Sequence, residues 1–153
     1  MEKPVAQIDF QGIYKTEDQY RIKFVSSVNL DILYNEQNDE KVVSRRLVCS
    51  LVDDVNFSVD HNLEKFFRGH FEVSLTSSNM EDGPFKYESI GNFYFSQDRG
   101  TSKRVIDDID LIQTLRLRTT IPCRVVMTIY LRRPYYSTIM HIPTAEIVAE
   151  INR

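Results

Sequence analysis

Residues 66–96 read FFRGHFEVSLTSSNMEDGPFKYESIGNFYFS, and this stretch decides the fold that the sequence predicts. Apolar and polar residues alternate over 67–75 and again over 85–95, which is the period of a strand with one buried face. The segment between them contains Asp82-Gly83, a pair that tolerates the positive φ of a tight turn. We therefore predict a β-hairpin with an aromatic face, interrupted by a bulge or bend at Gly91-Asn92.

Three stretches before the hairpin alternate in the same way, namely 5–14, 20–34 and 42–59. The hairpin needs such neighbours, because a lone hairpin is only marginally stable in water. Strands are therefore predicted over about 5–96. The chain of 153 residues is long enough to bury a core of its own, and we predict a single domain over residues 1–153.

The pattern changes in the last third of the chain. Apolar residues from Ile106 to Leu115 recur at three- and four-residue spacing, with acids in the first turn, as in an amphipathic helix. Residues 122–132 fit a helix and a strand equally well, because the segment follows a possible helix start but also alternates and is rich in β-branched residues. Residues 145–151 predict a closing helical turn or two.

Composition and charge narrow the classes of function. The chain has 42% hydrophobic and 27% charged residues, which is typical of a soluble globular protein. A net charge of −3 and an isoelectric point near 5.6 give no basic footprint for duplex nucleic acid. The sequence shows no apolar signal-peptide region and no window apolar enough for a membrane span. We therefore predict a cytoplasmic protein with no nucleic-acid partner and no membrane insertion, in which Cys49 and Cys123 are buried free thiols.

The sequence contains no clear catalytic motif. His70-Phe71-Glu72 and Pro122-Cys123 match two halves of the zinc-deaminase signature, but position 126 is Val where the second cysteine would stand. We find no glycine-rich phosphate loop, nucleophile elbow or Cys–His signature. Basic groups such as Lys103-Arg104 are interspersed with acids, and a solvated face is the simpler interpretation. We therefore predict a protein that is not an enzyme and has no metal or cofactor.

Three stretches carry a resemblance to a known family. They are FEVSLTSSNMEDGPFKYESIGNFYFS at 71–96, LRLRTTIPCRVVMTIYLRRPYY at 115–136 and YYSTIMHIPTAEI at 135–147. The layout resembles the SecB-like chaperones over roughly residues 8–150. The first stretch looks like that family's central strands, the second like its long helix, and the third like its extended segment before a closing helix.

The resemblance implies an α+β fold, in which a four-stranded antiparallel sheet has C-terminal helices packed on one side over about 105–151. It also implies that 122–132 is helix and that the chain forms dimers or a dimer of dimers. The implied function is that of an ATP-independent holdase for non-native polypeptide, in protein export or dedicated to an antitoxin. Glu88 is the one position that matches the acidic surface used to dock the SecA motor, which leaves SecA uncertain as a partner.

An extended apolar client would need a groove lined by adaptable side chains. The candidates lie at loops or at the ends of elements, and they are Phe66, Phe67, Tyr135, Tyr136, Ile139 and Met140. The alternative function is a small β-rich binding or inhibitor module that docks one folded protein partner. Exposure of Tyr135, Tyr136 and Met140 distinguishes the two, because only the holdase needs them at the surface.

Overall fold

The computed structural model describes residues 3–74 and 84–153. The strands of this part are β1 (Ile8–Lys15), β2 (Tyr20–Ser26), β3 (Val42–Ser50), β4 (Lys65–Val73), β5 (Phe85–Gln97), β6 (Ser102–Val105), β7 (Thr120–Ile129), β8 (Tyr135–Tyr136) and β9 (Met140–Pro143). The helices are α1 (Asp108–Leu115) and α2 (Thr144–Ile151), and two 3-10 turns are η1 (Glu36–Asn38) and η2 (Asp98–Gly100). Strands therefore continue into the C-terminal third, and the predicted four-stranded sheet with a helical C-terminal region is wrong.

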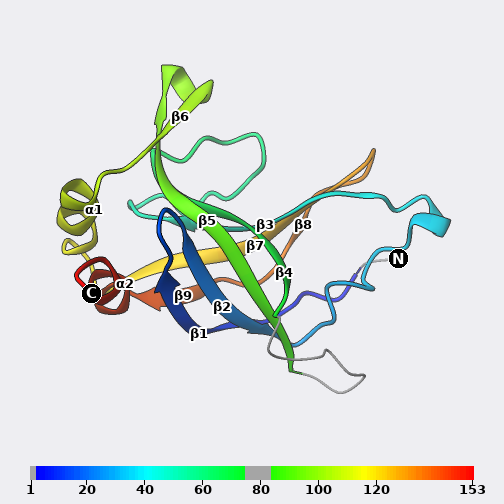
Figure 1. The fold of residues 1–153 in the computed structure, drawn as a ribbon. Helices are drawn as coiled ribbons and strands as arrows, with labels where there is room; N and C mark the ends of the chain where they lie inside the picture. The colour runs from blue at the N-terminus through cyan, green and yellow to red at the C-terminus, as the bar shows by residue number, and fades with distance from the viewer. Residues whose placement is uncertain (1–2, 75–83) are drawn as a thin grey trace.

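The nine strands of the described residues belong to one antiparallel sheet that curls into a nearly closed barrel (Figure 1). The order is β1-β2-β5-β4-β3-β7-β8, with β6 paired to β5 and β9 paired to β7. The two ends of this order meet through the N-terminal segment. The Thr138 amide donates to the Ala6 carbonyl at 2.9 Å, and the Tyr135 hydroxyl accepts from the Ala6 amide and donates to the Pro4 carbonyl, both at 2.7 Å.

The predicted hairpin strands are confirmed as β4 and β5, which pair in one continuous register. Gly69 lies opposite Gly91 without a register shift, so the bulge predicted at Gly91-Asn92 is absent from this pair of strands. A Cβ added at Gly91 would lie 2.0 Å from the Arg68 carbonyl oxygen. The glycine pair is therefore needed for close approach of the two backbones. Leu75 and the predicted Asp82-Gly83 turn lie outside the described residues.

The inward-facing side chains of the strands form the barrel core. Its largest fully buried side chains include Phe24, Phe67, Phe71, Tyr87 and Phe93. The alternation in the sequence therefore identified the buried face of β2, β4 and β5.

Within 122–132, the residues up to Ile129 belong to strand β7. The helix that the resemblance implied for this segment was therefore a wrong prediction. Ile121, Val125 and Met127 are fully buried on the inner face of β7. β3 pairs with one edge of β7, and β8 and β9 pair with the other. Hydrogen bonding on both edges, together with the β-branched composition, favours the strand.

The two cysteines face each other across β3 and β7, where Cys49 is the direct partner of Cys123. They form a disulfide with a Cα–Cα distance of 4.0 Å, and both are fully buried. The prediction of free thiols is therefore wrong, because it did not consider that these strands are neighbours.

The two predicted helices are confirmed and lie together near one end of the barrel (Figure 1). Asp107 caps α1, where its side chain accepts a hydrogen bond from the Asp110 amide at 2.9 Å. Leu111 and Leu115 of α1 and Ile147 of α2 are buried in the core. None of the helices in the described part of the chain is both long enough and apolar enough to cross a bilayer.

Candidate functional site

The outer face of β3, β4 and β7 carries a pocket of about 350 Å³, which is in the size range of ligand-binding pockets. Its floor is apolar and consists of Val48, Phe66 and Val126 from the three strands. Phe57 and Leu63 pack on this floor from the segment that follows β3. These five residues form a second apolar cluster, separate from the barrel core.

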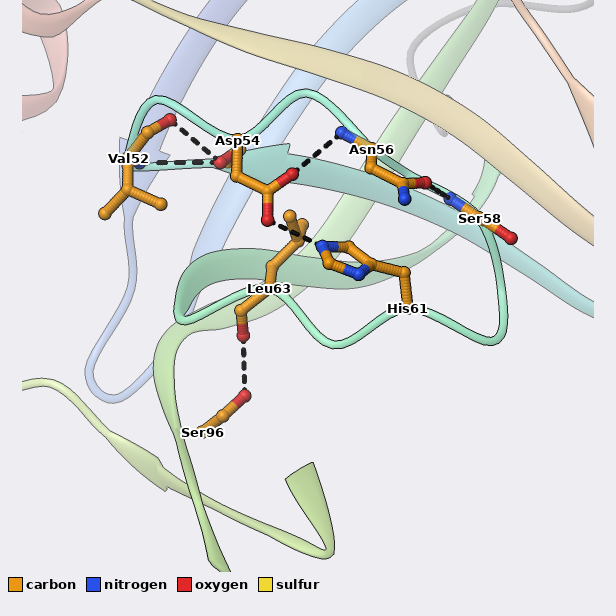
Figure 2. Close-up of polar contacts among 8 residues, drawn as sticks. Val52, Asp54, Asn56, Ser58, His61, Leu63 and Ser96 are labelled. Carbon is orange, nitrogen blue, oxygen red and sulfur yellow. Dashed lines mark hydrogen bonds and ion pairs between the residues drawn. The ribbon is translucent and has the colours of Figure 1, made fainter. Parts of the chain in front are cut away.

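The wall of the pocket is residues 51–64, which we call the wall loop. The Asn56 amide donates to the Asp54 carboxylate at 3.0 Å, and the Ser58 amide donates to the Asn56 side-chain oxygen at 3.0 Å (Figure 2). His61 Nε2 lies 2.6 Å from the other carboxylate oxygen of Asp54 and closes the loop on itself. The predicted strand over 42–59 is therefore wrong beyond residue 50, because these short polar side chains bond to nearby backbone amides and turn the chain.

The wall loop is also tied to the sheet at both ends and near its middle. The Leu51 amide donates to the Lys65 carbonyl at 2.9 Å. The Ser96 hydroxyl donates to the Leu63 carbonyl at 2.6 Å, as Figure 2 shows. Near its middle, the Val59 amide donates to the Tyr136 hydroxyl at 3.2 Å. The pocket therefore has a wall held by hydrogen bonds before any ligand arrives.

Three cations converge on this face, and we call Arg46, Arg68 and Lys103 the basic trio. Arg46 and Arg68 line the pocket. Arg68 and Lys103 line an adjoining pocket of about 280 Å³, which shares Leu63, Phe66 and Arg68 with the first. Within the described residues, no ion pair involves any member of the trio.

The surroundings of Arg68 and Lys103 disfavour the positive charges of these two side chains. Burial lowers the pKa of Arg68, and repulsion from Arg46 is a second, smaller cause. Burial also lowers the pKa of Lys103, and repulsion from Arg68 and Arg46 contributes less. The three like charges are thus close enough to repel one another, and an anion between them would relieve the repulsion.

Aromatic rings hold two of the cations in place. The Arg68 guanidinium carbon lies 4.9 Å from the centre of the Phe66 ring, and Lys103 Nζ lies 4.6 Å from the centre of the Tyr94 ring. Arg68 Nε is buried and has no hydrogen-bond partner among the described residues. A buried donor without a partner is costly, so this nitrogen adds to the demand for an acceptor.

The six residues predicted for a client groove do not come together in one groove. Phe67, Tyr135 and Met140 are at most 6% exposed and belong to the barrel core. Phe66 lies in the pocket floor and Tyr136 packs against the same apolar cluster, whereas Ile139 is 38% exposed. Two of the three residues whose exposure would indicate a holdase, Tyr135 and Met140, are therefore buried.

Glu88, predicted as an acidic docking position, is only 7% exposed. Its carboxylate accepts hydrogen bonds from Arg21 at 2.6 Å and from the Tyr14 hydroxyl at 3.1 Å. These two contacts occupy the charge that a docking partner would need.

The partial zinc signature does not assemble. Cys123 is in the disulfide, while His70 lies exposed on β4. Across 3–74 and 84–153, no three metal-ligating side chains form a group suited to a metal ion.

Sequence reasoning missed the basic trio. Arg46 and Arg68 lie on the outward parity of β3 and β4, and each is visible in the alternation of its own strand. Their convergence with Lys103 depends on the pairing of strands, which alternation within a strand does not reveal.

No protein-family model, curated protein or solved structure matches the chain. The SecB-like resemblance therefore stays a prediction.

Proposed function

We propose that the chain is a binding module that docks one folded protein partner at the pocket on the outer face of the sheet. The observation that carries the proposal is the combination of a hydrogen-bonded wall, an apolar floor and a basic trio that forms no ion pair within residues 3–74 and 84–153. Charged groups around a desolvated apolar centre are the arrangement that gives protein interfaces their specificity. The role is non-catalytic, in line with the absence of a recognised catalytic motif in the sequence.

The geometry supports this function better than that of a holdase. A holdase needs an adaptable apolar groove, but Phe67, Tyr135 and Met140 pack in the core. Exposing them would require opening the barrel. The pocket, in contrast, is preformed and small, which suits one partner and reduces the entropic cost of binding.

A site-directed crosslinking experiment tests the proposal in cells to which the protein is native. A photoreactive amino acid replaces Val59, which is 52% exposed on the pocket wall. The matched control carries the same group at Leu117, which is 83% exposed after α1. We expect one discrete protein adduct from position 59 and none from position 117. Equal adducts from both positions, or none from position 59, would contradict docking at the pocket.

Light scattering with a reduced, unfolded test protein separates the two candidate functions. The docking module is expected to ignore the unfolded chain at any ratio of the two proteins. A stable complex with the unfolded test protein would instead favour the holdase function.

A further inference from the structure

We propose that the basic trio binds the carboxylates of an acidic segment of the partner protein, in which aliphatic side chains flank the acids. This inference rests on the proposed docking function and names the chemistry of the segment that docks. It makes Arg46, Arg68 and Lys103 the residues that select the partner.

The strand register brings the trio together on one face. Val48 pairs with Arg68 and Arg46 pairs with His70 between β3 and β4, so the two arginines are diagonal neighbours on the outer face. Phe66 pairs with Tyr94 between β4 and β5, and Lys103 on β6 reaches over the Tyr94 ring. The three charges therefore border one continuous surface formed by the two adjoining pockets.

Carboxylates satisfy what this surface lacks. The planar guanidinium of an arginine offers paired donors that match the two oxygens of a carboxylate. Arg68 has a buried Nε without an acceptor, and no carboxylate of the described chain pairs with the trio. An acid from a partner would thus neutralise repelling charges and supply a missing acceptor at the same time.

Aliphatic neighbours of the acids fit the apolar part of the surface. Val43 and Val59 line the pocket and are 61% and 52% exposed, although both are hydrophobic. Val48 and Val126 continue the apolar surface below them. A segment that places a leucine, isoleucine or valine beside its carboxylates would cover these residues while the acids contact the trio.

The same contacts argue against single-stranded nucleic acid as the anion. In proteins that bind single-stranded nucleic acid, the bases stack on exposed aromatic rings. Here Arg68 lies over Phe66 and Lys103 lies over Tyr94, so cations already cover the rings nearest to the trio. Asp54 and Asp60 on the wall loop and the net charge of −3 also oppose a polyanion.

The test selects binders from a random peptide library displayed on phage. The targets are the wild-type protein and the triple variant Arg46→Gln/Arg68→Gln/Lys103→Gln, which is first shown by circular dichroism to be folded. We expect the wild type to select peptides with Asp or Glu beside aliphatic residues, and the variant to lose this preference. A wild-type selection without acidic residues, or the same peptides from both targets, would overturn the proposal.

A titration with one selected peptide then assigns the contacts. Arg68→Gln and, separately, Lys103→Gln are expected to raise the dissociation constant about tenfold each, since each removes a charge-assisted contact. The matched control is Arg116→Gln, which changes an exposed arginine beside α1 and should leave the constant unchanged. Added salt should weaken binding to the wild type. Equal constants for all variants, or displacement of the peptide by a thymidine oligonucleotide, would refute the assignment.

The two levels of the proposal fail in different ways. An acidic consensus without a discrete adduct at position 59 would end the docking function but keep the carboxylate site. A discrete adduct at position 59 without an acidic consensus would keep the docking function and end the carboxylate site.

Discussion

The phenol of Tyr87 shows what one buried polar atom contributes to this barrel. The ring is fully buried, and its oxygen accepts a hydrogen bond from the Leu30 amide at 2.7 Å. Burial raises the pKa of Tyr87 well above its usual value, and the negative charge of Asp31 adds to this effect, so the hydroxyl stays protonated even in mildly alkaline solution.

Replacing Tyr87 by phenylalanine leaves the Leu30 amide buried without an acceptor. We expect Tyr87→Phe to lower the free energy of unfolding by about 1–3 kcal/mol, measured by urea denaturation. Tyr130→Phe is the matched control, because Tyr130 is 59% exposed and water can reach its hydroxyl. Equal stability of the wild type and Tyr87→Phe would show that the hydrogen bond contributes nothing net.

The facing glycines of β4 and β5 provide a second test at the level of single residues. A methyl group at Gly91 would collide with the Arg68 carbonyl and with Gly69, which are main-chain atoms that cannot turn away. We expect Gly91→Ala to lower the free energy of unfolding by about 3 kcal/mol. Gly12→Ala is the control, since nothing lies within 4 Å of its added Cβ. If thermal denaturation ranks the two variants equally, the strands are not as close as described.

Single residues were predictable where their environment is local. The inward orientation of Phe67, Phe71 and Tyr87 follows from alternation within a strand, and the structure confirms it. The disulfide and the basic trio were not predictable in this way. Each joins residues on different strands, and only the order of strands in the sheet makes them neighbours.

At the scale of elements, the wall loop should respond to acid. The hydrogen bond with His61 lowers the pKa of Asp54 below its usual 3.8, and the hydrogen bond from the Asn56 amide is the second cause. A carboxyl group whose pKa is lower in the folded state stabilises that state at any pH above its pKa in the unfolded chain. This stabilisation is lost as the pH falls through the lower pKa of the folded state. We therefore expect the loop to be closed at neutral pH and to loosen below about pH 3.8.

Amide hydrogen exchange along an acid titration measures this loosening. Amides of the wall loop such as Asn56 should lose protection before those of β3. In Asp54→Asn the loop should be looser at neutral pH and should lack this acid step. Simultaneous loss of protection in the loop and in β3 would mean that acid unfolds the whole barrel instead.

Two elements show where pattern reading fails. Residues 51–59 alternate like a strand, but the side chains of Asp54 and Asn56 accept hydrogen bonds from the backbone amides of Asn56 and Ser58 and make a loop. Residues 122–132 fitted helix and strand equally, and the resemblance then implied helix. The segment is a strand because its backbone pairs with β3 on one edge and with β8 and β9 on the other. Local periodicity in the sequence does not reveal such long-range pairing.

At the scale of the whole molecule, the disulfide joins residues that are 74 positions apart. Closing so long a loop restricts the unfolded chain, and we expect the bond to stabilise the barrel by about 2–4 kcal/mol. Urea denaturation with and without a reductant measures the difference. The double variant Cys49→Ala/Cys123→Ala is the control, because its stability should not depend on the reductant.

Thiol counting provides the complementary result. The unfolded, unreduced protein should show no free thiol, whereas two free thiols would restore the prediction of reduced cysteines. The same count on protein taken from its native cells tests the predicted cytoplasmic location, since disulfides are rare in the reducing cytosol.

Closure of the barrel by both ends of the chain also constrains its synthesis. Ala6 bonds to Thr138, and β3 receives its partner β7 only after residue 129 has been made. A nascent chain that has emerged through β5 therefore carries an unpaired edge on β3 and another on β1. Such edges are templates for aggregation, and long-range pairing is slow to form. The ribosome must make the chain through residue 138 before the barrel can close, so a chain stalled between β5 and β7 would expose edges that aggregate.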